Sequence, residues 1–416
     1  MMRIFITLLA LVALTTANAQ SALIKNATVH TATSAGTLDQ TDILIQDGKI
    51  HRLGHDLKAA DSVPVFDAAG RSVTPGLFGG IAPLGISEID LEAASVDSKL
   101  ALPEFRPEFS VLPAYNPNSS RIAINRVEGV TQVLVAPAAS GSIVAGTGNV
   151  VTLDGSYDAA ISTAVLFINM GGDVSDLSGG SRAAQYMLLE QALDEAGSRK
   201  EINGHLRLLT ERGRTTLNAY TRSGRNVVFG VDRASDILQV LKFASNHGMK
   251  AVIHGGAEAW MVANQLAAAN VPVILDPLVN LPVSFDHLGA TMENAARLYA
   301  AGVTIVFSQR GTGTGPRKNR QIAGNAVAHG LPWHAALAAL TSNPAAIFDY
   351  DDRLGSIEPG KQADLVIWSG DPLEVTSFAD QVFMAGTAIS MESRQTRLRD
   401  RYLPENPGKP RAYIKP

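Results

Sequence analysis

Cysteine is absent from the 416-residue chain. This absence excludes disulfide bonds, thiol nucleophiles and cysteine-ligated zinc. Without disulfides the fold must rest on its hydrophobic core, and hydrophobic residues make up 46% of the sequence against 18% charged residues. Such a composition favours a large buried core and argues against disorder. The length suits one large domain with a smaller one attached.

The sequence also lacks a strong excess of charge of either sign. It contains 35 Lys and Arg residues and 39 Asp and Glu residues, which gives a net charge of -4. Proteins that bind nucleic acid depend on a basic excess to neutralise phosphates, and long runs of like charge indicate interaction tails. Neither is present, so no nucleic-acid partner is predicted.

Long apolar runs are missing as well, so no membrane-spanning helix is predicted. At the N-terminus, Arg3 precedes an apolar run over residues 4–14 that is too short to span a bilayer, and Ala17-Asn18-Ala19 fits the rule for signal-peptide cleavage. We predict that residues 1–19 are a signal peptide and that the mature chain is exported without a membrane anchor, to the periplasm in a Gram-negative source. The alternative is a buried N-terminal helix.

Both ends of the chain are predicted to be rich in β-strands. Residues 22–29 carry β-branched alternation, residues 42–50 read as two strands around an Asp-Gly turn, and further strand patterns occur at 355–368 and 381–386. We predict that residues 20–72 and 352–395 meet in one small sheet domain. Residues 396–416 are predicted to form an extended tail because of their prolines, Pro404, Pro407, Pro410 and Pro416.

The middle of the chain, residues 73–351, alternates between strand and helix patterns. Helices are predicted over residues 234–246, 257–269 and 325–339, and strands near residues 131–136, 164–169, 226–231, 250–254, 271–275 and 303–307. This spacing indicates βαβ units in a parallel sheet or barrel. With the strand that begins at Val73, seven strands can be counted, and the missing one is sought between Leu206 and Gly224. The glycine-rich residues 141–148 fit no dinucleotide fingerprint and are interpreted as a loop.

Three motifs resemble those of one enzyme superfamily. They are VTPGL at residues 73–77, RVEGVT at residues 126–131, and LTSNPAA at residues 340–346 followed by LGSIEPGKQADLVIWSGDPLE. Over residues 22–395 the chain resembles the exported, imidazolonepropionase-like branch of the amidohydrolase superfamily. The resemblance implies an α/β fold, a (β/α)8 TIM-type barrel with a composite β-sandwich built from the N- and C-terminal segments. It also implies hydrolysis of C–N bonds by one or two divalent metals at the carboxyl ends of the barrel strands.

Carried over position by position, the superfamily's metal-binding residues are mostly replaced. Its two first-strand histidines correspond to Ile81 and Pro83, its fifth-strand histidine to Gly230, and its eighth-strand aspartate to Arg310. Its sixth-strand histidine is kept as His254, and the fourth-strand ligand cannot be placed. Because catalytic zinc uses about three protein ligands, the resemblance predicts a lost metal site and no cofactor, with zinc bound through His254 only if the chain is an enzyme.

Two further groups of residues are candidates for function. His254 and Asp232 follow strands and are candidate catalytic residues; the alternatives are a structural histidine and a helix-start carboxylate. The four cations Arg310, Arg317, Lys318 and Arg320 are predicted to bind an anionic group of a substrate. The alternative for them is a solvated loop that pairs with Glu88, Asp90 or Glu92.

Three functions remain open from the sequence. The leading interpretation is an exported amidohydrolase homologue without a metal site, which acts as a non-catalytic or regulatory partner of an intact homologous subunit. The second is an active hydrolase of a small amide, cyclic imide or dipeptide-like compound. The third is a protein that binds a small anionic molecule.

Overall fold

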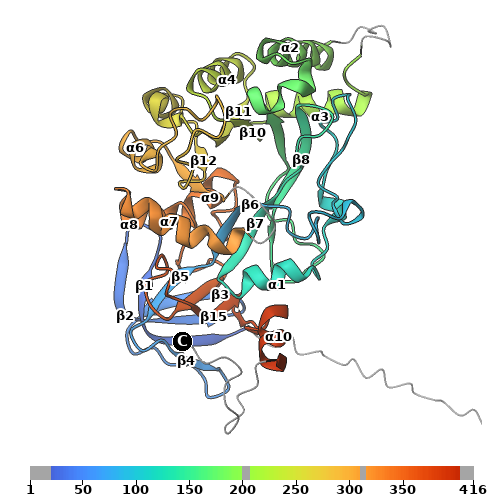
Figure 1. Cartoon of the computed structure of the whole chain (residues 1–416). Coiled ribbons are helices and arrows are strands. Elements are labelled where there is room, and N and C mark those ends of the chain that lie inside the picture. Colours follow the sequence, from blue (N-terminus) through green and yellow to red (C-terminus); the bar gives the residue numbers. More distant parts are fainter. Residues whose placement is uncertain (1–19, 199–206, 310–314, 403–416) are drawn as a thin grey trace, which may run out of the picture.

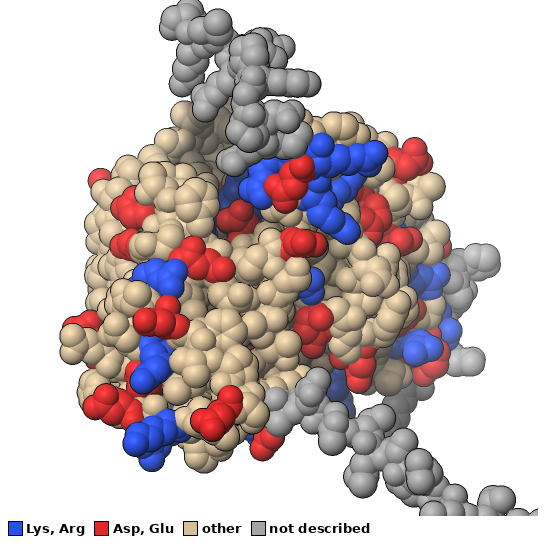
Figure 2. All heavy atoms as spheres, turned by 90° about the horizontal axis from the view of Figure 1, so that it is seen from below, with Lys and Arg blue, Asp and Glu red and all other residues tan. Residues whose placement is uncertain are grey.

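The computed structural model describes residues 20–198, 207–309 and 315–402. The predicted signal peptide and Arg310 therefore lie outside the described residues. Among those residues, no helix is long and apolar enough to cross a membrane. Acidic and basic side chains are interspersed over most of the face seen in Figure 2.

Strands from both ends of the chain form one sheet, as predicted. The N-terminal segment supplies β1 (Ala22–His30), β2 (Thr37–Gln46), β3 (Lys49–Gly54), β4 (Val65–Asp67) and β5 (Ser72–Pro75), and the C-terminal segment supplies β14 (Leu365–Trp368), β15 (Ala379–Met384) and β16 (Thr387–Ala388). The two segments join where β14 pairs antiparallel with β5. Figure 1 shows the blue and red strands together at one end of the molecule. The strands of these two terminal segments form a single connected sheet, so the β-sandwich stays a prediction.

The β2–β3 turn shows how the sequence determines this local structure. Asp47 and Gly48 both have positive φ, 51° and 76°. Two consecutive residues with positive φ make the type I′ turn that matches the twist of a hairpin, and Asp-Gly is among its preferred sequences. The predicted hairpin is confirmed.

The middle of the chain forms a nearly closed barrel of eight strands. In spatial order they are β6 (Leu77–Ile81), β7 (Val130–Val135), β8 (Val144–Thr152), β9 (Val165–Asn169), β10 (Asn226–Val231), β11 (Lys250–Gly255), β12 (Val273–Leu275) and β13 (Ile305–Phe307). The first and last strands approach each other where the backbone N–H of Ile81 donates to Ser308 Oγ at 2.9 Å. The predicted α/β class and eight-stranded barrel are confirmed.

The eighth strand is not where the sequence suggested it. Residues 211–222 form helix α3 (Glu211–Arg222), and the missing strand is β8, which includes most of the stretch interpreted as a loop. This strand runs antiparallel to both β7 and β9, so the barrel departs from a regular (β/α)8 pattern. Its glycines weaken the strand signal, yet close packing requires them. A Cβ on Gly148 would lie 2.0 Å from the carbonyl oxygen of Val135.

Helices follow most of the later strands. The helix α1 (Ser120–Arg126) precedes β7, and α2 (Arg182–Gly197) and α3 follow β9. The prediction for residues 234–246 is confirmed by α4 (Ala234–Asn246). Each later strand is followed by shorter helices: the 3-10 helix η5 (Ala259–Val262) and α5 (Ala263–Ala268), then α6 (Asn294–Ala300), then the 3-10 helix η6 (Pro316–Lys318), α7 (Asn319–Ala328), α8 (Trp333–Ala338) and α9 (Ser342–Ile347).

Two helical predictions and the predicted extended tail need correction. The stretch 257–269 is divided into η5 and α5, and the stretch 325–339 is divided between α7 and α8. Gly330, with φ of 97°, and Pro332 interrupt the second stretch because proline cannot continue a helix that precedes it. The start of the predicted extended tail is instead helical in α10 (Arg394–Tyr402), since the prolines lie beyond it.

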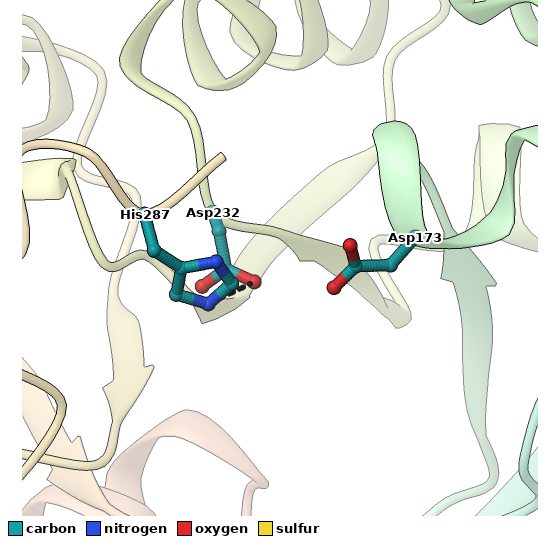
Figure 3. Close-up of side chains that lie close together, drawn as sticks. All are labelled: Asp173, Asp232 and His287. Atoms are coloured by element: carbon teal, nitrogen blue, oxygen red, sulfur yellow. Dashed lines mark ion pairs between the residues drawn. The ribbon is translucent and has the colours of Figure 1, made fainter. Parts of the chain in front are cut away.

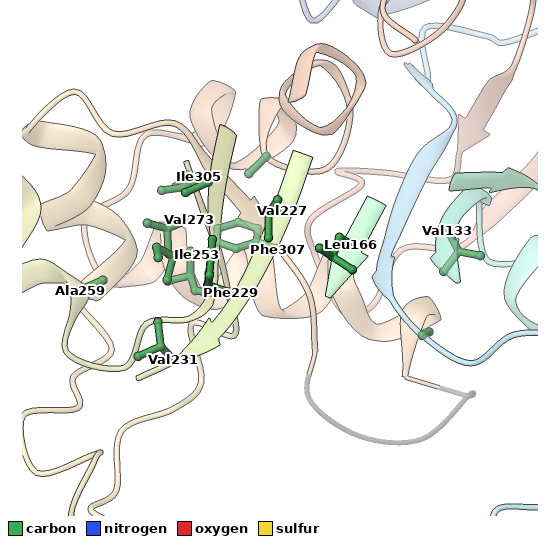
Figure 4. Packing of buried hydrophobic residues seen from close by; sticks show 14 of the residues in the cluster. Val133, Leu166, Val227, Phe229, Val231, Ile253, Ala259, Val273, Ile305 and Phe307 are labelled. Carbon is green, nitrogen blue, oxygen red and sulfur yellow. The ribbon is translucent and has the colours of Figure 1, made fainter. Parts of the chain in front are cut away.

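Side-chain alternation along the strands divides the core into two parts. The residues Phe78, Leu134, Val150, Phe167, Val228, Val252, Ile274 and Val306, one from each barrel strand, belong to one buried cluster that fills the barrel interior. Their neighbours in sequence belong to a second cluster with the surrounding helices. Figure 4 shows this outer layer, with Val227, Phe229 and Val231 along β10 beside residues of the following strands.

Candidate active site at the barrel mouth

A cavity of about 430 Å³ lies at the carboxyl ends of the barrel strands. It is lined by the end of β6, the segment after β7, and the ends of β9, β10 and β11. This is the end of a TIM-type barrel at which active sites are found. The predicted residues His254 and Asp232 both line the cavity.

His254 belongs to a row of inward-facing positions above the barrel core. The strand register pairs Gly230 with Asn169 on one side and with His254 on the other. Each lies two residues beyond an interior residue of its own strand, so the three positions face the inside of the barrel. All three line the cavity.

Asn169 is a site residue that the sequence reasoning missed. It ends β9, the fourth barrel strand once β8 is counted. Its side chain lies beside Gly230, where an added Cβ would be 2.6 Å from Asn169 Oδ1. The space that a larger residue at position 230 would need is therefore taken by the Asn169 amide. With β8 counted as the third barrel strand, Asn169 would have been recognised in the sequence as the residue at the end of the fourth strand.

The wall of the cavity near β6 and β7 is apolar. Ile81 and Pro83, the residues aligned with the superfamily's first-strand histidines, both line it, together with Ala136 and Ala138. Their side chains offer no lone pair for a metal and no hydrogen-bond donor. This wall is suited to hydrocarbon parts of a ligand.

The opposite side of the cavity is acidic. Asp232 Oδ1 accepts a hydrogen bond from the backbone N–H of Ala257 at 3.1 Å, and its Oδ2 lies 3.4 Å from Nε2 of His287. His287 is only 1% exposed, and its Nδ1 is hydrogen-bonded to Ser284 Oγ at 2.8 Å. The first backbone N–H of α4, that of Ala234, is bonded instead to Glu258. Asp232 therefore faces the cavity and His287 rather than this helix start.

Asp173 brings a second carboxylate to the same place. It lies on the 3-10 helix η3 (Gly172–Ser178), which follows β9. One donor atom each from Asp173, Asp232 and His287 lies within 4.8 Å of the other two. Figure 3 shows the Asp173 carboxylate directed toward Asp232 and His287, which lie next to each other. Sequence reasoning missed Asp173 and His287 because both follow strands in loops that carry no recognised motif.

Buried hydrogen bonds fix the loop that carries His287. Glu258, which is buried, accepts from Gly289 N at 2.9 Å and from Ala234 N at 3.0 Å, and so links this loop to α4. Trp260 Nε1 donates to the carbonyl oxygen of Gly289 at 2.8 Å. The backbone on the C-terminal side of His287 is thereby held, and an imidazole on a fixed backbone needs little reorganisation to bind a ligand.

An ion-pair network fixes η3 in the same way. Arg182, at the start of α2, forms ion pairs with Asp286 and with Asp236, the latter at 3.0 Å. Asp286 also accepts from the backbone N–H of Gly172 at 2.6 Å. Burial raises the pKa of the Asp236 carboxyl, and the Arg182 guanidinium opposes this shift. Asp286, which precedes His287, thus ties η3 and its Asp173 to the loop of His287.

Three of the four predicted anion-binding cations, Arg317, Lys318 and Arg320, do not line this cavity. Arg310 lies outside the described residues. Lys318 is exposed, Arg317 donates its backbone N–H to Asn125 Oδ1, and Arg320 is buried against the segment 372–377. Among the described lining residues there are three aspartates, Asp173, Asp232 and Asp286, and neither lysine nor arginine. Asp90, one of the acidic residues suggested as a partner for the loop, pairs with Arg121 at 2.7 Å.

The sequence profile of the Amidohydrolase family matches residues 179–390, slightly more than half of the chain. The chain belongs to the amidohydrolase family. A crystal structure of an amidohydrolase from Thermotoga maritima MSB8 is similar over 88% of this chain and 99% of that one, with 26% identity and a TM-score of 0.79. The structure of molinate hydrolase, with 17% identity, a TM-score of 0.56 and coverage of 96% and 99%, shows the shared fold alone.

Curated relatives of this amidohydrolase are distant. Amidohydrolase tasK of Hapsidospora irregularis is 22% identical over 398 residues, covering 83% of this chain and 39% of the relative. Imidazolonepropionase of Aromatoleum aromaticum is 35% identical over 136 residues, covering 29% and 32%, and that of Treponema denticola is 26% identical over 195 residues, covering 40% and 46%. The chain thus spans less than half the length of each of these relatives.

Members of the amidohydrolase family usually bind a divalent metal. Two carboxylates and one imidazole are a donor set that suits zinc, manganese or iron, and Asp173, Asp232 and His287 provide it. The predictions of a lost metal site and of no cofactor are not supported, because three possible ligands lie close together, at positions other than those aligned with the superfamily's ligands. The loss of ligands at Ile81, Pro83 and Gly230 stays a prediction.

Proposed function

We propose that this amidohydrolase binds a small amide-containing molecule at the barrel mouth and hydrolyses its C–N bond. The cavity supports this proposal because it combines polar and apolar sides at the end of the barrel where active sites occur. His254 and Asn169 face the inside of the barrel, toward its axis, and Asp232 and His287 form a pair on the neighbouring segments. The wall around Ile81 and Pro83 is apolar.

In the proposed reaction, the residues of the cavity have different roles. The Asn169 amide hydrogen-bonds the substrate's carbonyl or N–H, and the apolar wall holds its hydrocarbon part and excludes water. His254 transfers a proton at the reacting centre, since imidazole is the commonest group for this purpose. A divalent cation, when bound, supplies Lewis acidity toward the carbonyl group and lowers the pKa of water.

The charge of the cavity narrows the class of substrate. Three aspartates line it, whereas no lysine or arginine does so among the described residues. A substrate carboxylate would be repelled there, so we propose neutral or basic amides, cyclic imides and dipeptide-like amides without a free acid at this end. The described lining residues do not favour the hypothesis of a small-anion binding protein, and substrate binding by Arg310, which lies outside the described residues, stays a prediction.

A comparison of three variants tests the proposed hydrolysis. Purified protein with added Zn²⁺, Co²⁺ or Mn²⁺ is assayed for amine release from a panel of the three compound classes. We expect turnover, and a fall in kcat/KM of at least about 100-fold in Asp232→Asn and His254→Gln, the usual effect of removing a positioned catalytic group. Asp176→Asn, which changes an exposed carboxylate of η3 that does not line the cavity, is expected to retain the wild-type rate.

The second candidate is a non-catalytic subunit of an intact homologous amidohydrolase. The observation that favours it is the presence of Ile81, Pro83 and Gly230 along the cavity, where the resemblance places metal-binding histidines. Absence of turnover in every assay, together with co-purification of a homologous hydrolase whose rate changes on removal of this chain, would support it over the first.

The processing and domain organisation predicted from the sequence are also proposals. We propose cleavage after Ala19, export to the periplasm, a composite sheet domain from residues 20–72 and 352–395, and a barrel over residues 73–351. The motivation is the Arg3 and apolar pattern at the N-terminus and the pairing of β5 with β14. The intact mass of the protein recovered from fractionated cells tests the export; an uncleaved chain in the cytosolic fraction would contradict it.

A further inference from the structure

The geometry points to a divalent metal site formed by Asp173, Asp232 and His287, beside the barrel axis rather than on it, and we propose that it holds the ion of this amidohydrolase. This inference rests on the proposed function and adds the location of the ion. It places the ion on the loops after β9, β10 and β12, whereas the sequence placed the residual ligand at His254 on β11.

The distance between Asp232 and His287 fits a shared ion better than a hydrogen bond. A hydrogen bond between an imidazole N–H and a carboxylate is about 2.7–2.9 Å long, but Asp232 Oδ2 and His287 Nε2 are 3.4 Å apart. Two donors that each lie about 2.1 Å from a tetrahedral ion are about 3.4 Å apart. The observed separation therefore equals the value expected across a bound cation.

The other atoms of these two side chains are anchored in the way that metal ligands usually are. His287 Nδ1 is hydrogen-bonded to Ser284 Oγ at 2.8 Å, which leaves Nε2 directed toward Asp232. Asp232 Oδ1 accepts from Ala257 N at 3.1 Å, which turns Oδ2 toward His287. Hydrogen bonds to the far atom of a ligand fix its orientation and its protonation state.

Asp173 completes the set from the exposed side. Donors on a tetrahedral ion lie about 3.4 Å apart, so in a cluster whose donor atoms lie within 4.8 Å of one another the Asp173 carboxylate must move toward the other two, by roughly 1 Å, to bind. Asp173 is exposed and can make this movement through its side chain. Three protein ligands leave at least one coordination position for substrate or water, which is the arrangement of a catalytic rather than a structural site.

The charge around the cluster favours a cation as well. Asp286 lines the same cavity next to His287, and Arg182 pairs with it and with Asp236. Of the four aspartates at positions 173, 232, 236 and 286, Arg182 pairs with two, Asp236 and Asp286. An excess of carboxylates in a partly buried site attracts a divalent cation.

Metal titration of the full chain tests the site without relying on activity. The protein is stripped with a chelator and titrated with Co²⁺, with binding followed by visible absorption and by metal analysis, and Zn²⁺ is measured by competition. We expect about one ion per chain, and at least about 100-fold weaker binding in Asp232→Asn and His287→Gln. Ser284→Ala keeps all three ligands and is expected to weaken binding by about 10-fold, the usual effect of losing a partner of a ligating histidine.

Two matched controls make the result decisive. Asp176→Asn removes an exposed carboxylate from the helix that carries Asp173, and His254→Gln removes the imidazole on the barrel axis; both are expected to leave Co²⁺ affinity within about 3-fold of wild type. Because His287 is buried, folding of each variant is checked by thermal unfolding, and only folded variants that also lack the metal-dependent rise in Tm support the site.

The outcomes separate this inference from the proposed hydrolysis. Loss of Co²⁺ binding in His254→Gln together with unchanged binding in His287→Gln and Asp232→Asn would place the ion on the axis and overturn the inference, whether or not amides are hydrolysed. Wild-type protein that binds neither ion at millimolar concentration would overturn it too. One tightly bound ion at this site without turnover would support the inference and contradict the hydrolysis.

Discussion

Replacing Arg320 with alanine is expected to lower the free energy of unfolding by about 4 kcal/mol, because it removes a buried cation with fixed partners. Arg320 is 3% exposed and donates to the carbonyl oxygens of Glu374 and Ser377, both at 2.7 Å. Its guanidinium also lies 3.7 Å from the Glu128 carboxylate and 5.5 Å from the centre of the Trp368 ring. Alanine would leave these oxygens without their donor in a buried place.

Urea unfolding of three variants checks this expectation. Lys318→Ala changes an exposed residue at the end of η6, two positions before Arg320. It is expected to change stability by less than about 0.5 kcal/mol. Arg320→Lys keeps the charge but cannot donate to several carbonyls in one plane, so we expect an intermediate loss. If Arg320→Ala were as stable as wild type, the carbonyl contacts would contribute little, and an anion-binding role for Arg320 would regain support.

Arg320 also shows a limit of reading function from sequence. A glycine-rich loop with several cations after a barrel strand suggests an anion site, and nothing near it in sequence indicates otherwise. The hydrogen-bond partners of Arg320, however, are backbone carbonyl groups that lie more than 50 residues later in the chain, after β14. Such contacts are set by how the terminal sheet packs on the barrel, which local patterns do not encode.

The elements predicted best were those in which local preference and tertiary position agree. The strand at Asn226–Val231 and the helix at Ala234–Asn246 have the predicted bounds, since a run of apolar residues with three valines is followed by an amphipathic helix that ends before Gly248. The antiparallel β8 was missed because its glycines serve close backbone contacts that only the folded barrel contains.

The candidate site could be predicted only in part for the same reason. Asp232 and His254 follow strands with clear patterns, so their place at the barrel mouth was accessible from sequence. Asp173 and His287 lie in segments whose positions depend on Asp286, Arg182 and Glu258. A ligand set built from three loops has no fixed spacing, so no motif could have identified it.

The second large effect is expected in the pH dependence of stability. It arises from Asp364, which is buried between the terminal sheet and the barrel. Its Oδ1 accepts from Ala385 N at 2.8 Å and from Gln362 Nε2 at 2.9 Å, and its Oδ2 accepts from Gln132 Nε2 of β7 at 2.9 Å. Burial nevertheless raises the pKa of this carboxyl to about 6, from an ordinary value of 3.8. In this site desolvation outweighs the three donors, because it penalises the charged form.

The sign of the effect follows from proton binding. Between about pH 4 and 6 the folded protein holds a proton on Asp364 that the unfolded chain has released, so stability falls as pH rises through this range. A shift of about two pKa units corresponds to a loss of roughly 3 kcal/mol. Asp364→Asn cannot titrate, so the difference in unfolding free energy between variant and wild type should move in favour of the variant by this amount from pH 4 to 7.

Measuring that difference at each pH isolates Asp364 from every other titrating group, because all of them are shared by the two proteins. An asparagine oxygen can still accept from Ala385 N and Gln362 Nε2, whereas its NH₂ would face the Gln132 NH₂ unless the Gln132 amide turns over. Rotation of the Gln132 amide would cost free energy that does not depend on pH. It would therefore shift the whole curve of unfolding free energy against pH for the variant without changing its slope. Parallel curves for the two proteins would therefore show that the pKa of Asp364 is not raised on folding, so that the three donors offset desolvation.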